Sequence, residues 1–217
     1  MSKMLMKEIK LAASPLSFLF LVFTLMTFIP SYPILVSAFF VSFGIFHTFQ
    51  ASRENNDTIY SVRLPISKKD IVKSKFIFTA AVEIVGVVLF LLFAIVRMTA
   101  LSDAAPYVNN AMMNANLYYV GYCLIVFALF NIVFFRGFYK TGYYFGKPFV
   151  AFIVVSFLFI CFAEVIHHIP GLEFLNTSNT ERLGTQIGVF AVCAVIYALI
   201  SYASLKMSQD NFEKIDL

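Results

Sequence analysis

The chain has 217 residues, of which 60% are hydrophobic and 13% are charged, and its formal net charge is +4. Its mean hydropathy is +0.84. Soluble domains carry about 25% charged residues, so this chain has too few polar side chains to cover a soluble core, and the composition excludes a soluble globular protein. We therefore expect an all-α membrane protein that forms a single transmembrane domain over residues 1–217.

The N-terminal segment, residues 1–13, combines basic and apolar residues at helical spacing. Lys3, Lys7 and Lys10 recur every three or four residues, and apolar residues can occupy the opposite side of a helix. This pattern predicts a basic amphipathic helix lying at the membrane surface; the alternative is a charged tail that only fixes orientation. The region around Ser31 lacks a signal-peptide cleavage motif and further apolar segments follow, so we expect the first apolar segment to be retained.

Six apolar segments are predicted to span the membrane. They cover about residues 15–29, 34–49, 76–96, 117–135, 148–166 and 183–205. The first two are shorter than the roughly 20 residues of a full crossing, so they either recruit flanking residues or form one broken hairpin. We favour two crossings, because the charges on both flanks then fall on one side.

The basic residues are distributed very unevenly between the two sides of this arrangement. Fourteen of the 16 Lys and Arg residues lie on one side, and only Arg97 and Arg182 lie on the other. The positive-inside rule therefore predicts that the basic side, which carries both ends of the chain, is cytoplasmic.

The most polar stretch lies between the second and third predicted spans. Ser67 is a typical helix N-cap, and Asp70 three residues later completes a capping box. Ile66 and Ile71 can form the hydrophobic staple, and Pro65 keeps the preceding residue extended. These features predict a short basic helix over residues 67–75, presented at the cytoplasmic membrane surface for docking against a partner.

A second basic loop, residues 136–147, is rich in glycine and aromatic residues. Its glycines predict turns rather than a long helix. The loop is interpreted either as an aromatic and lysine belt at the membrane interface or as a second, smaller docking element, and not as a site for nucleic acid.

Several ionisable residues lie within or at the ends of the predicted spans, and His47, at the cytoplasmic end of the second span, is interpreted as interfacial. Glu83 is predicted either to line a cavity or to form a structural hydrogen bond, since carboxylates in spans face a bundle interior or water. Glu164 and His168, with the neighbouring His167, lie at helical spacing; we favour interfacial hydrogen bonding over a metal site. Three cysteines lie inside apolar runs, which favours packing roles.

No motif for an enzyme or a cofactor is found. The chain has no G-x-x-x-x-G-K-[ST], no H-E-x-x-H and no G-x-S-x-G. The sequence therefore predicts a protein without catalytic residues and without a nucleotide or metal site of its own.

Residues 61–75 carry a resemblance to a known family. The run Ser-Val-Arg-Leu-Pro-Ile-Ser-Lys-Lys-Asp-Ile-Val-Lys-Ser-Lys resembles the S-L-P-I-S-R-x-x-I-V-x-x-K stretch that follows the second span in permease subunits of bacterial ABC-2 type exporters, in particular the small stand-alone six-span permeases. Glu54 and Asn55 are similar to the start of the same loop. Arg63 and Lys68 differ from the usual residues of the family, and neither difference affects the docking interpretation.

The resemblance implies a transport function. Two permease chains, identical or related, would pair around a central pathway in the bacterial cell membrane, and each would rest on an ATPase subunit that holds ATP and Mg²⁺. The substrate would be amphipathic or hydrophobic, such as a peptide toxin or bacteriocin, with Glu83 as a pathway-lining residue. The ATPase-coupling residues would be Pro65, Ile66, Ser67, Lys68, Lys69, Asp70, Ile71 and Lys73, with secondary contacts at Arg136, Tyr139 and Lys140.

Two other function classes remain open from the sequence. One is a stand-alone membrane immunity or sensor protein that binds a peptide at the outer loops, residues 97–116 and 167–182. The other is an intramembrane enzyme that uses Glu83 or the Glu164 and His168 pair. Either class would function without a partner ATPase.

Overall fold

The computed structural model describes residues 6–8, 13–108, 110–141 and 144–215. Within these residues the chain is helical and has no β-strand, which confirms the predicted all-α class. The elements in chain order are α2 (Pro15–Leu19), η2 (Phe20–Phe28), α3 (Val36–Glu54), α4 (Asp57–Val62), α5 (Lys68–Thr99), α6 (Ala105–Val108), α7 (Leu117–Leu129), η3 (Phe130–Phe135), α8 (Arg136–Thr141), α9 (Gly146–Ile166), η4 (Glu173–Asn176) and α10 (Leu183–Glu213).

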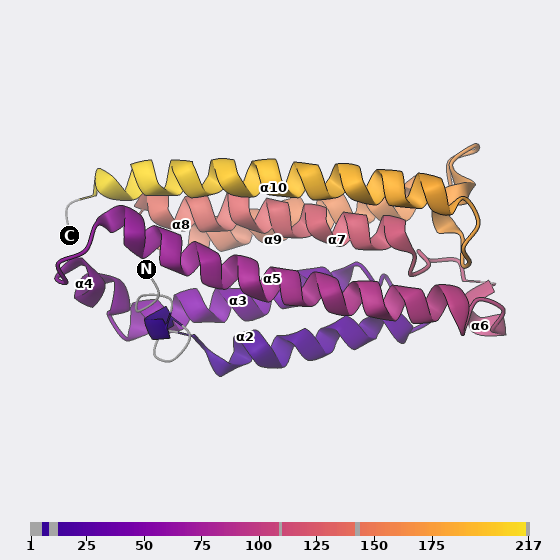
Figure 1. Cartoon of the computed structure of the whole chain (residues 1–217), viewed down its shortest axis with the longest axis horizontal. Helices are drawn as coiled ribbons and strands as arrows, with labels where there is room; N and C mark the ends of the chain where they lie inside the picture. The colour runs from indigo at the N-terminus through magenta and orange to yellow at the C-terminus, as the bar shows by residue number, and fades with distance from the viewer. Residues whose placement is uncertain (1–5, 9–12, 109, 142–143, 216–217) are drawn as a thin grey trace.

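The long helices lie alongside one another in an elongated bundle (Figure 1). Helices α10, α7 and α9 form one side, α2 and α3 form the other, and α5 runs between them. The C-terminal end of α10 and the short helix α4 lie at one end of the bundle, which we call the basic end. Helix α6 lies at the opposite end, which we call the loop end.

Four of the described helices are long and apolar enough to cross a membrane: Lys68–Thr99, Leu117–Thr141, Gly146–Ile166 and Leu183–Glu213. Residues Pro15–Phe28 form a shorter apolar helical segment. The chain is therefore a multi-pass membrane protein.

Helix α3 corresponds to the second predicted span but is much less apolar than the others. Most of its residues are buried inside the bundle, including Ser37, Ser42, Thr48 and Ser52. Such hydroxyls are tolerated because they bond within the protein; Ser42 Oγ, for example, donates to the Ala38 carbonyl at 3.0 Å. A helix surrounded by other helices does not need the apolar surface that lipid requires.

Three predicted boundaries are wrong. The helix predicted to end at Lys75 is the start of α5, which continues without a break to Thr99. The helix predicted to span residues 183–205 continues to Glu213. The predicted turn at Gly137 lies inside helix α8, which follows η3 directly.

Gly137 is required by packing rather than by a turn. A Cβ atom at this position would lie 2.8 Å from Cβ of Pro148, at the start of α9. Glycine therefore allows α8 and α9 to approach closely. Around this contact the core is rich in phenylalanine: Phe46 stacks on Phe149 with ring centroids 3.8 Å apart.

Candidate functional site

The first turn of α5 forms as its sequence predicts. The hydroxyl of Ser67 accepts the backbone N–H of Asp70 at 3.1 Å and donates to the Asp70 carboxylate at 2.7 Å. The predicted N-cap is thus confirmed. The Asp70 carboxylate accepts a hydrogen bond from the Ser67 hydroxyl, whereas in a capping box it would accept one from the Ser67 backbone N–H. A side-chain cap of this kind satisfies a backbone donor that has no partner within the helix.

The predicted docking residues divide into exposed and buried groups. Pro65, Ser67, Lys69 and Asp70 are exposed, as is the neighbouring Arg63. We call these five residues the α5 entry surface.

The remaining predicted docking residues lie deeper in the bundle. Ile66, Lys68 and Lys73 are half-buried. Ile71 is only 4% exposed and belongs to the hydrophobic core. The prediction that Ile71 contacts a partner is therefore corrected: it packs the helix against the bundle.

The start of α5 is bound to the end of α10. Lys69 forms an ion pair with Glu213 at 3.0 Å, and Gln209 Nε2 donates to the Lys69 carbonyl at 3.2 Å. The ammonium group of Lys68 donates to the carbonyl of Ile215. These contacts join residues about 140 positions apart in the chain, so no local pattern predicted them.

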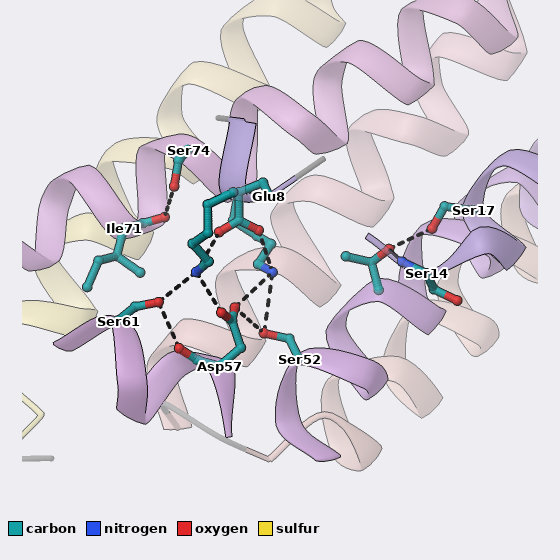
Figure 2. A network of polar contacts seen from close by, with 11 residues as sticks. Glu8, Ser14, Ser17, Ser52, Asp57, Ser61, Ile71 and Ser74 are labelled. Atoms are coloured by element: carbon teal, nitrogen blue, oxygen red, sulfur yellow. Dashed lines mark hydrogen bonds and ion pairs between the residues drawn. The ribbon is translucent and has the colours of Figure 1, made fainter. Parts of the chain in front are cut away.

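Four charged residues from the N-terminal segment, α4 and α5 form a group that we call the charge cluster: Lys7, Glu8, Asp57 and Lys75 (Figure 2). Glu8 and Lys75 are buried, and Lys7 and Asp57 are partly buried. Lys75 pairs with Glu8 at 2.6 Å and with Asp57 at 3.6 Å. Lys7 pairs with Asp57 at 2.6 Å and with Glu8 at 3.2 Å. The formal charges cancel, so the cluster binds the N-terminal segment to α4 and α5 without leaving a net buried charge.

Serine hydroxyls complete the charge cluster. Ser52, near the end of α3, donates to Asp57 at 2.9 Å and accepts from Lys75 at 3.3 Å. Ser61 accepts from Lys7 at 2.6 Å. Hydrogen bonds to both ammonium groups and to a carboxylate reduce the cost of burying these ions.

Within the charge cluster, the neighbouring opposite charges shift the pKa values of Asp57 and Lys7. Burial acts to raise the pKa of Asp57, but the cations of Lys75 and Lys7 outweigh it and hold that pKa below its ordinary value. Burial acts to lower the pKa of Lys7, but Glu8 and Asp57 outweigh it and raise that pKa above its ordinary value. Both shifts favour the charged form.

Two interpretations from the sequence change with this geometry. Lys75, the last residue of the helix predicted to be presented for docking, is 3% exposed and pairs with Glu8 and Asp57 in the charge cluster. Lys7, predicted to lie on the basic face of a helix at the membrane surface, pairs with Asp57 in the same cluster. The rest of the helix predicted over residues 1–13 lies largely outside the described residues.

Of the three residues predicted to make secondary contacts, only one has an exposed side chain. Tyr139 is 2% exposed and packs against Phe135 and Phe212, with ring centroids 5.1 and 5.2 Å away. Arg136 is half-buried, and Lys140 is exposed. Tyr139 is therefore a core residue, and its prediction as a direct contact is corrected.

Glu83 lies in the middle of α5 and is fully buried. Its Oε2 atom accepts hydrogen bonds from Asn131 Nδ2 at 3.0 Å and from the Tyr197 hydroxyl at 2.6 Å. Of the two interpretations of Glu83, the structure thus shows the hydrogen-bonded one. Asn131 and Tyr197 come from η3 and α10, so this polar group connects three helical segments.

At the loop end, polar side chains hold the connecting loops. Glu164 Oε2 accepts the backbone N–H of Met113 at 3.0 Å, which confirms the predicted interfacial hydrogen bonding. Arg97 is 3% exposed and donates to the Thr27 carbonyl at 2.6 Å and to Asn114 Oδ1 at 3.1 Å. Across the described part of the chain, no group of three or more His, Cys, Asp or Glu side chains is placed to hold a metal ion.

Comparison with known proteins identifies the family. A family model described as "ABC-2 family transporter protein" matches residues 3–210. No curated protein and no solved structure matches the chain. Because the family match covers nearly the whole chain, including the α5 entry surface and the charge cluster, the chain belongs to the ABC-2 family of transporter proteins and is an ABC-2 type permease.

Proposed function

We propose that this permease is the membrane subunit of an ATP-driven exporter, and that a separate ATPase subunit docks on the α5 entry surface. The observation that carries the proposal is the continuity of α5. The exposed, capped first turn belongs to the same 32-residue helix that runs through the bundle. At 1.5 Å per residue, this helix is about 48 Å long.

A continuous helix is a good transmitter of movement. A force on a flexible loop is lost in backbone rotation, whereas a displacement of Ser67 moves the whole of α5. The ion pair with Glu213 passes the same displacement to α10. An ATPase with two nucleotide-dependent shapes would shift the permease only by contacting this surface differently in each shape.

The proposal also includes the orientation of the bundle, the partner subunits and the substrate class. The basic end lies in the cytoplasm, six helical segments cross the bacterial cell membrane, and ATP and Mg²⁺ are bound by the partner ATPase. A second permease chain completes the pathway. The substrate is an amphipathic or hydrophobic molecule, such as a peptide, for which a bundle containing 27 phenylalanines offers an apolar environment.

Co-purification with the ATPase encoded beside this chain tests the docking surface. We expect Arg63→Glu with Lys69→Glu to abolish a complex that the wild-type chain forms. The matched control is Arg182→Glu with Lys206→Glu, which reverses two exposed cations outside the surface and outside residues 136–147 and should leave the complex intact. A complex that survives the first pair of changes would contradict the proposed docking site.

A charge swap separates loss of docking from loss of the internal ion pair. Lys69→Glu alone also breaks the pair with Glu213. Adding Glu213→Lys restores an opposite-charge pair between α5 and α10 but leaves a reversed charge at position 69. Binding that stays low in the swap supports direct contact with the ATPase, whereas full recovery shows that only the internal pair matters.

A further inference from the structure

Glu83 has an unusual environment for a carboxyl group inside a membrane bundle. The two donors described above both bind Oε2, and Oε1 is buried without a hydrogen-bond partner. Among the described residues, no Lys, Arg or His forms an ion pair with it. An ionised carboxylate without a cation is strongly disfavoured in such surroundings.

A second acceptor in the same group also lacks a donor. The amide nitrogen of Asn131 donates to Glu83 and to Ser201 Oγ, each at 3.0 Å. The amide oxygen, Oδ1, is buried and has no hydrogen-bond partner. Two neighbouring side chains thus each leave one oxygen without a donor, a situation that costs free energy in a dry interior.

One added proton on Glu83 resolves both problems. A protonated Oε1 is neutral, and it is a hydrogen-bond donor. A carboxylic acid and a primary amide pair through two parallel hydrogen bonds, one in each direction. The bond from Asn131 Nδ2 to Oε2 is the first of these, and a bond from Oε1–H to Asn131 Oδ1 would be the second.

We propose that Glu83, Asn131 and Tyr197 form a proton-binding site, and that Glu83 holds the proton while α5, η3 and α10 are packed together. Tyr197 is the titratable group that touches Glu83, and it comes from α10. Asn131, on η3, does not ionise. The site is defined by these contacts alone and does not depend on the proposed export function.

Release of the proton is linked to movement of α10. This helix supplies Tyr197 and Ser201, and its Ser204 hydroxyl donates to the backbone carbonyl of Asn131. Separation of α10 from η3 and α5 breaks these contacts and admits water. The Oε1–H bond of Glu83 then breaks, its electron pair stays on the carboxylate, and the proton passes to water. Rearrangement of the bundle thus releases one proton from each chain, and repacking takes one up.

Infrared spectroscopy of the purified chain at neutral pH tests the proton directly, without any ATPase. We expect Glu83→Gln to remove a carboxylic-acid C=O band from the wild-type spectrum. The matched control, Glu181→Gln, changes an exposed carboxylate and should remove carboxylate bands instead. Loss of carboxylate bands in Glu83→Gln, with no loss of an acid band, would overturn the proposal.

A second variant keeps the test decisive if Glu83→Gln does not fold. In the protonated group Oε2 is the carbonyl oxygen, and Tyr197 is one of its two donors. Tyr197→Phe removes that donor, so the acid C=O band should shift to higher frequency. An unshifted band, or the absence of any acid band sensitive to this change, would show that Glu83 does not hold the proton in this site.

Discussion

At the scale of single residues, Lys75 carries the largest expected effect on stability. It is buried and pairs with both carboxylates of the charge cluster. Lys75→Met leaves Glu8 and Asp57 with Lys7 as their one cation in the cluster, and removing one partner from a buried ion pair costs about 3–5 kcal/mol. We expect a loss of this size in the free energy of unfolding, measured by denaturation in detergent.

The double variant Lys75→Met with Glu8→Gln is the control for this prediction. It removes one charge of each sign, so part of the lost stability should return. Losses that add without any recovery would show that Lys75 and Glu8 act independently, contrary to the geometry of the cluster.

Asp57 makes the cluster sensitive to acid. Its folded-state pKa lies below its ordinary value, so its contribution to stability is present above about pH 4, the pKa of an unperturbed Asp. The contribution is lost as the pH falls through the lower, folded-state pKa. As the pH is lowered through this range, the unfolding temperature should fall more steeply for the wild-type chain than for Asp57→Asn. Parallel curves would contradict the role of Asp57.

At the scale of helices, the contact between α8 and α9 depends on a single glycine. Gly137→Ala places a Cβ 2.8 Å from Pro148 Cβ, and overpacking of this kind costs about 1–3 kcal/mol. Gly188→Ala is the control, because a Cβ there meets nothing within 4 Å and alanine favours the helix. We expect only Gly137→Ala to lower the unfolding temperature.

Local signals predicted where α5 begins but not where it ends. Ser67 and Asp70 form a cap through neighbouring atoms, and such short-range chemistry is visible in sequence. The predicted end near Lys75 followed the change from polar to apolar composition. That change in composition marks a change of environment, but it does not end the helix. No helix-breaking Gly or Pro lies between Lys68 and Val85, so α5 continues.

At the scale of the whole molecule, periodicity and hydropathy predicted the helical class and the approximate positions of the long helices. The charge cluster could not be predicted in the same way, because its members come from three separate segments of the chain. Lys7 and Glu8 meet Asp57 and Lys75 only after the bundle forms. Tyr139 was mispredicted for the same reason. Its place in a basic loop predicted an exposed side chain, whereas Phe212 of the distant helix α10 packs against it.

The proposed orientation of the bundle makes a prediction for the entire chain. Asp103 and Glu181 are exposed at the loop end, and Lys140 and Lys214 are exposed at the basic end. If the six segments all cross and the basic end is cytoplasmic, single cysteines at the first two positions should react with a membrane-impermeant maleimide in intact cells. Cysteines at the other two should react only after permeabilisation.

The native cysteines must first be replaced, because Cys161 is exposed on the bundle surface. If Lys140→Cys is labelled in intact cells and Asp103→Cys is protected, the orientation of the bundle is the reverse of the one proposed. Labelling of both would instead place the two positions on the same side, with an even number of crossings between them. An even number would mean that the helical segment Leu117–Thr141 does not cross the membrane, and the α5 entry surface could not then share a compartment with Lys140 on α8.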